Sequence, residues 1–430
     1  MASTQPTHSR PTHNTSPIRW ETLLCSLLIA IALICLYLRL HATHENSFAD
    51  IDIFLDAAES HQKNGIIYKR TPDLPAGYAP TAPTYKFPPF YLWTLKAFAG
   101  ENRQESIEAI ALSSLFFYCT TILICLILIH RTLPANSITP FRLSVLIAFF
   151  CLFDGFIASY GFLAPEIPIN LLVCLAALLA QQRPFLAGNC IALASALKIY
   201  PAYMTFYFAA QWKWRALFGI AAITIISLAI SYLYAGQNEF IFYFRKILPI
   251  LASEPMVESA ANLNMRRFFQ SLGASRETAI ALYYPLLLAL TITTCKLLYQ
   301  QRNDPWSPNR YCLVICLMLI SMKNYWPQYL ILLSLPVALM IIQSSTRLQK
   351  TACGFILLVL CTREEWAMAV AARTLQDNPG LITEQARISE MNILSAYFTI
   401  DVKAGILFTL YSLSPLAPVA LWRYHFCRCR

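Results

Sequence analysis

Three acidic side chains stand just beyond the first long apolar run of the chain. Asp50, Asp52 and Asp56 lie in the segment FADIDIFLDAAES, residues 48–60. Apolar residues recur there at helical spacing, so Asp50 is well placed to cap a helix at the membrane surface. A carboxylate at such a half-dry boundary can also act as a general base that deprotonates a hydroxyl. Asp52 and Asp56 are either solvated surface acids or groups that position an acceptor sugar.

A lysine interrupts a later apolar run. Lys198 lies within FLAGNCIALASALKIYPAYMTFYFAAQWKWR, and a lysine at membrane depth is costly unless an anion pairs with it. A carboxylate or a phosphate would be a suitable anion to pair with Lys198. Asp154 is the first internal candidate, and Glu166 beside two prolines could equally approach. Both a structural ion pair and a phosphate-binding role remain open for Lys198.

Two adjacent arginines follow two asparagines in SAANLNMRRFFQSLG, residues 259–273. These are Asn262, Asn264, Arg266 and Arg267. Paired arginines make bidentate contacts to phosphate readily, although they also flank surface helices without any functional role.

Aromatic residues gather in two further segments. TYKFPPFYLW contains Tyr85 and Lys86, and SMKNYWPQYLILLSLP contains Trp326 and Gln328. Aromatic belts at the lipid interface explain such clusters, and Trp and Gln are also typical of a sugar-binding edge. Lys86 could contact a lipid phosphate or extend its stem along the apolar surface.

The composition predicts an all-α polytopic membrane protein. Of the 430 residues, 57% are hydrophobic and only 13% are charged, and apolar runs long enough to span a bilayer recur along the chain. The net charge of +10 comes from basic residues beside these runs, which fits the positive-inside rule and excludes a nucleic-acid partner. No metal site or cofactor is indicated, although Asp50 and Asp52 could hold a divalent ion loosely.

The basic loops all fall on one side when the apolar runs are threaded through a bilayer, with about 11–12 transmembrane helices. Helices are expected near residues 23–40, 106–130, 143–160, 164–180, 216–235, 279–299, 310–322, 325–343, from 351 and 402–422, with a broken pair over 185–215. The predicted organisation is a cytoplasmic disordered tail (1–19), a single transmembrane domain (20–422) with extracytoplasmic segments (41–105, 236–278 and 373–400), and a basic cytoplasmic tail (423–430).

The order of these motifs resembles that of a known enzyme family. ADIDIFLDAAESHQKNGIIY followed by YKFPPFYLWTLKAFA is similar to the first loop of the GT-C membrane glycosyltransferases, most of all to family 87, once labelled DUF2029. The stretch from Asn170 through Lys198 to Pro201, NLNMRRFFQSLG, and SMKNYWPQYLILLSLP follow in the family's order.

The resemblance implies a GT-C fold and an inverting transferase that uses a polyprenyl-phosphate-linked sugar as donor. Mannose or a related glycosyl unit would pass to a glycan or glycolipid hydroxyl, with Asp50 as general base. Lys198, Arg266, Arg267 and Lys86 would neutralise the leaving phosphate. The other implied substrate-binding residues are Asp52, Tyr85, Asn170, Asn262, Asn264, Trp326 and Gln328. Membrane lipids are the remaining partners, and the expected location is a bacterial inner (plasma) membrane, with the active site on its extracytoplasmic face.

The sequence departs from the family pattern at three places, and three other interpretations stay open. Ile167-Pro168 replaces Gly-Gln, Met322 replaces Pro, and Gln328 replaces His. These changes bear on the identity of the substrate. A GT-C mannosyltransferase of another family is one alternative. A transporter or flippase for lipid-linked sugars, with Lys198 and Asp154 along its route, is another, and an inactive scaffold partner would not need Asp50.

Overall fold

The protein is an all-α polytopic membrane protein, as predicted. The computed structural model describes residues 20–45, 51–68, 85–98, 102–134, 137–252, 264–303, 306–323 and 326–361, and the regular elements in this part are all helical. Both tails, the third extracytoplasmic segment and the helix expected at 402–422 lie outside these residues, so the predicted domain boundaries stay predictions. The elements used below are α1 (Trp20–Glu45), α2 (Ile51–Asn64), α3 (Pro89–Leu95), α4 (Arg103–Thr132), α5 (Pro140–Leu152), α6 (Asp154–Phe162), α7 (Glu166–Leu179), α8 (Pro184–Leu197), η3 (Tyr200–Met204), α9 (Thr205–Ala210), α10 (Trp214–Phe242), η4 (Tyr243–Ile247), α11 (Leu248–Ala252), α12 (Met265–Ser271), α13 (Arg276–Gln300), α14 (Pro308–Ser321), η5 (Pro327–Leu333), α15 (Ser334–Gln343) and α16 (Arg347–Cys361).

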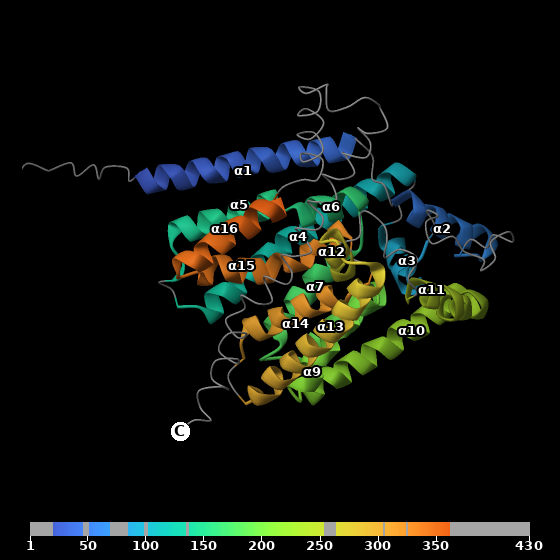
Figure 1. The fold of residues 1–430 in the computed structure, drawn as a ribbon. Helices are drawn as coiled ribbons and strands as arrows, with labels where there is room; N and C mark the ends of the chain where they lie inside the picture. The colour runs from blue at the N-terminus through green and yellow to red at the C-terminus, as the bar shows by residue number, and fades with distance from the viewer. Residues whose placement is uncertain are drawn as a thin grey trace, which may run out of the picture.

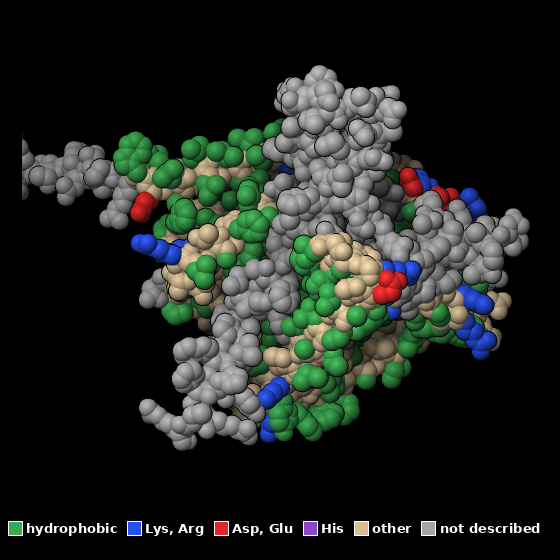
Figure 2. Space-filling view, viewed as in Figure 1, with side chains coloured by type: hydrophobic (Ala, Val, Ile, Leu, Met, Phe, Trp, Pro, Cys, Tyr) green, Lys and Arg blue, Asp and Glu red, His purple; other side chains and the backbone are tan. Residues whose placement is uncertain are grey.

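Five helical stretches among the described residues are long and apolar enough to cross a membrane. They are Trp20–His41, Arg103–Thr132, Pro140–Phe162, Trp214–Ile247 and Arg276–Gln300. Only 11% of the α1 window is buried within the protein, so its apolar surface faces outward, where lipid can cover it. Figure 2 shows hydrophobic side chains along the helices, with charged side chains mainly toward the ends of the bundle.

Shorter apolar helices fill the interior of the bundle. Helices α7, α8 and α14 have 14 residues each, about 21 Å at the usual rise, which is less than the hydrocarbon thickness. Such helices can end at membrane depth only where protein covers their ends, and α7 and α14 are indeed largely buried. In Figure 1, α2, α3 and α11 gather at one end of the bundle.

The chain bends where sequence breakers predict it. Lys198 closes α8, and η3 and α9 follow as two short segments, so the predicted broken pair is present. Helix α10 contains a break at Gly236, with φ 74° and ψ 163°, at the position where the second polar loop was predicted to begin. A residue with a side chain would be strained in that conformation.

Glycines allow the central helices to approach closely. Helix α8 packs along α10, and a Cβ placed on Gly188 would overlap the carbonyl oxygen of Ala216. Gly219 of α10 is equally tight against the carbonyl of Phe185. Small residues at helix contacts are the usual means of close packing in membranes, where burial against lipid gives no hydrophobic gain.

We expect Gly188→Ala to destabilise the protein by about 1–3 kcal/mol, because the new methyl group meets backbone that cannot rotate away. The measurement is thermal unfolding of the purified protein in one detergent. Gly354→Ala is the matched control, since Gly354 lies exposed in α16 with no atom within 4 Å of its added Cβ. Equal unfolding temperatures for the two variants would contradict the close packing of α8 on α10.

Candidate functional site

A buried ion pair lies where two of the short helices end. Lys198 Nζ is 2.5 Å from Glu166 Oε1. Helices α7 and α8 are consecutive and antiparallel, so the first residue of α7 comes to lie beside the residue that follows α8. The carboxylate is at a helix N-terminus and the ammonium at a C-terminus, which is the favourable arrangement of both charges relative to the helix dipoles.

Two aromatic rings enclose the ammonium group. Lys198 Nζ lies 4.7 Å from the ring centre of Phe87 and 4.4 Å from that of Tyr329. The Tyr329 ring packs in turn against Tyr200 of η3, with centroids 5.1 Å apart. Phe87 precedes α3 and Tyr329 belongs to η5, so segments distant in sequence converge on one cation.

The two members of the pair differ in their exposure. The Lys198 side chain is 18% exposed, whereas the Glu166 side chain is 0% exposed. Glu166 Oε2 is buried without a hydrogen-bond partner. A ligand would therefore meet the ammonium first and the carboxylate behind it.

Asp154 is not the partner of Lys198, contrary to the first candidate from the sequence. Its carboxylate lies 2.9 Å from Arg39 Nη2, and Arg39 Nη1 donates to the carbonyl of Leu152. The helix is interrupted at Phe153, between α5 and α6. The carbonyl of Leu152 therefore has no backbone N–H donor from a following helical turn. Arg39 of α1 satisfies both groups, so Asp154 is paired with a cation other than Lys198.

Asp52 and Asp56 form a surface cluster with one arginine. Arg103 Nη2 lies 2.7 Å from Asp52 Oδ1, and Arg103 Nη1 lies 3.0 Å from Asp56 Oδ1. Both carboxylates are at least half exposed, so each pair contributes little to stability. Arg103 opens α4, and the cluster ties α2 to it. Asp50 precedes α2 and lies outside the described residues, so its role stays a prediction.

Tyr85 belongs to a packed aromatic group beside Lys198. Its ring lies 5.7 Å from that of Tyr68 and 5.8 Å from that of Phe87, and its hydroxyl donates to the carbonyl of Pro88. Burial raises the pKa of Tyr85 well above its ordinary value, so the hydroxyl remains a donor at physiological pH. Lys86 next to it is half-buried and has interactions of its own.

Asn170 holds α7 to the η5–α15 segment. It is fully buried, and its Nδ2 donates to Ser334 Oγ at 3.2 Å. Gln328 is also buried, and its carbonyl accepts from Ser159 Oγ of α6. Trp326, immediately before η5, is half-buried. These contacts position Tyr329, so Asn170 and Gln328 have structural contacts here, and substrate contacts for them stay predictions.

The second loop contributes one buried cation among the described residues. Arg266 of α12 is 2% exposed, as is the neighbouring Asn264, and α12 packs against α13, the helix that carries Tyr283. The Tyr283 hydroxyl donates to the carbonyl of Ser321 at the end of α14. Asn262 and the Arg267 side chain lie outside the described part of the chain.

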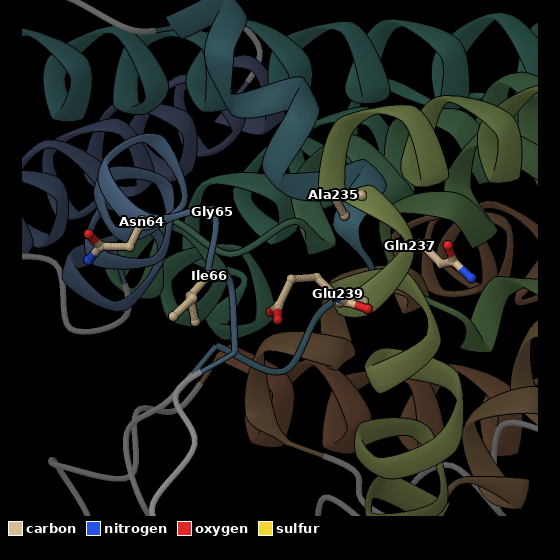
Figure 3. Close-up of a pocket in the computed structure, with 8 residues that line it drawn as sticks. Asn64, Gly65, Ile66, Ala235, Gln237 and Glu239 are labelled. Atoms are coloured by element: carbon tan, nitrogen blue, oxygen red, sulfur yellow. The ribbon is translucent and has the colours of Figure 1, made fainter.

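Glu239 is a buried acid that the sequence motifs above do not include. Its Oε2 accepts from the backbone N–H groups of Ile67 and Tyr68, both at 3.0 Å. It lines a cavity of about 360 Å³ between the end of α2 and the α10 break, and Figure 3 shows its side chain directed toward the Gly65–Ile66 backbone. The sequence feature that could have indicated this residue is an acid shortly after Gly236, where an apolar run ends. Glu239 anchors the first loop, because Tyr68 also donates to the carbonyl of Phe87.

Replacing one member of the Lys198–Glu166 pair should destabilise the fold. We expect Glu166→Leu and Lys198→Met each to cost about 3 kcal/mol, because each leaves one charge buried and unpaired. The double variant should lose less than the sum of the two. Thermal unfolding of the unaltered protein, the two single variants and the double variant gives the coupling free energy between the two side chains. Strictly additive losses of stability would contradict a direct interaction.

A comparison with known protein families bears on this site. The family model of glycosyltransferase family 87 matches residues 85–322, which is more than half of the chain and includes Lys198, Glu166, Asn170 and Arg266. Asp50, Asp52, Trp326 and Gln328 fall outside the matched region. No curated protein matches the chain. With its helical bundle and this match over most of the central helices, the protein belongs to glycosyltransferase family 87.

Proposed function

We propose that the protein is an inverting glycosyltransferase that moves a sugar from a polyprenyl-phosphate donor to a hydroxyl of a glycan or glycolipid. The observation that carries this proposal is Lys198, a cation held at the interior end of α8 in a chain of a glycosyltransferase family. A lipid-linked phosphate reaches such a depth from the surrounding bilayer, whereas a water-soluble nucleotide sugar would have to leave water. This consideration supports a lipid-linked donor.

Charge neutralisation is the main demand of this reaction. The bond between the anomeric carbon and the phosphate oxygen breaks, and the phosphate leaves with the electron pair. Lys198 stabilises that charge, because an ammonium in a water-poor environment acts more strongly than one in water. Arg266 is the second cation that we assign to the phosphate.

The acceptor needs a base. We assign this role to Asp50, which would take the proton of the acceptor hydroxyl as its oxygen bonds to the anomeric carbon from the side opposite the phosphate. This single displacement inverts the configuration at that carbon. Two observations support the choice: Ile51, the next residue, is buried at 1% exposure, and the nearby Asp52 is already paired with Arg103. We further propose that this chemistry takes place at the outer face of a bacterial inner membrane.

Asp50→Asn should abolish sugar transfer while donor binding is retained, because the amide cannot accept the proton. Transfer is measured with purified protein, polyprenyl-phosphate sugars and membrane glycolipid acceptors. Asp52→Asn is the control; since Asp52 is exposed and paired, it should retain most of the activity. Full activity in the Asp50 variant would remove Asp50 from the mechanism.

Lys198→Met should weaken binding of the donor lipid about tenfold or more, since a charge-assisted contact to phosphate is worth roughly 1.5–3 kcal/mol. Binding is measured by titrating polyprenyl phosphate into the protein in nanodiscs. Lys213→Met, a lysine between α9 and α10, is the control and should bind as the unchanged protein does. Unaltered binding in the Lys198 variant would leave Lys198 with a purely structural role.

A further inference from the structure

The two carboxylate oxygens of Glu166 differ in their hydrogen bonding. Oε1 accepts from Lys198, while Oε2 is buried and has no donor. Glu239, another buried carboxylate in the described residues, receives two backbone N–H groups, and Asp154 receives Arg39 and has further interactions. A buried carboxylate oxygen without a donor is costly, because it has lost water and gained nothing in exchange. Oε2 of Glu166 can therefore accept a hydrogen bond from a bound ligand.

The surroundings limit what that partner can be. A phosphate is an acceptor and carries negative charge, so it suits Lys198 and would be repelled by Glu166. Glu166 needs an O–H or N–H donor, and a sugar presents hydroxyl groups. The ligand approaches through Lys198, the more exposed member of the pair. Lys198 Nζ contacts Glu166 Oε1 directly, so one ligand reaches both side chains when its phosphate and its hydroxyl lie close together.

A sugar 1-phosphate has this arrangement, because the 2-hydroxyl is on the carbon that adjoins the anomeric carbon. We propose that Glu166 binds the donor sugar by accepting a hydrogen bond from its 2-hydroxyl, while Lys198 holds the phosphate. The assignment rests on the proposed function and specifies which part of the donor each group recognises. A contact to the 2-hydroxyl can also strengthen as positive charge develops at the anomeric carbon.

The same carboxylate discriminates between the two forms of the lipid carrier. The spent carrier, a polyprenyl phosphate without sugar, brings a negative charge close to Glu166 and no hydroxyl to compensate. The loaded donor brings the same charge together with the hydroxyl. Glu166 thus disfavours the product more than the substrate, which is specificity obtained through repulsion. It would speed release of the spent carrier after transfer.

The test is the ratio of two dissociation constants, that of polyprenyl phosphate divided by that of polyprenyl-phosphate sugars bearing mannose, glucose or arabinose. In Glu166→Gln this ratio should fall about tenfold, since the amide no longer repels the spent carrier and holds the hydroxyl more weakly. The spent carrier itself should bind as tightly as before or more tightly. Asp154→Asn is the matched control, a buried carboxylate paired with Arg39, and should leave the ratio unchanged.

A second measurement needs no variant. The unaltered protein should bind a 2-deoxy donor about tenfold more weakly than the parent donor, because the hydroxyl is absent. An unchanged ratio in Glu166→Gln, equal weakening of both lipids, or equal binding of the 2-deoxy donor would each overturn the Glu166 assignment alone. Failure of the unaltered protein to bind either lipid would overturn the proposed donor class as well.

Discussion

A charge held inside the helical bundle organises this protein. Lys198 directly follows the 14-residue helix α8 and its side chain is only 18% exposed, so the fold must provide an anion and a covering layer. Glu166 provides the anion, and Phe87 and Tyr329 provide the cover. Glu166 opens α7, Phe87 precedes α3 and Tyr329 lies in η5, so the packing of these three segments brings the groups together around Lys198.

Several buried polar contacts support this arrangement indirectly, by holding the segments that carry the two aromatic rings. Ser159 and Asn170 hold the η5–α15 segment that carries Tyr329, and Glu239 holds Tyr68, whose hydroxyl donates to the carbonyl of Phe87. Arg39 closes the helix break between α5 and α6 on the outer side of the bundle. Residues that look like substrate ligands in the sequence can therefore act by holding the aromatic enclosure in place.

Much of the fold could be predicted because apolar periodicity and breakers are local signals. The short helices and the break after Lys198 agree with the sequence-based boundaries, and Gly236, where the second loop was expected to begin, is a kink beyond which the chain stays helical to Ala252. The sequence leaves two candidates for the partner of Lys198, since Asp154 and Glu166 are both acids near apolar runs. The hairpin decides it: two helices of 14 residues bring position 166 back beside position 198. The helix break that occupies Asp154 with Arg39 depends on long-range packing, which no local pattern reveals.

The most direct test of the central claim is an experimental structure of the protein with a polyprenyl-phosphate sugar bound. The account predicts the phosphate within hydrogen-bond distance of Lys198 Nζ, the sugar beside Glu166, and the Asp50 carboxylate facing the anomeric carbon from the opposite side. A donor phosphate bound elsewhere, with Lys198 still enclosed by Phe87 and Tyr329 and paired only with Glu166, would contradict it.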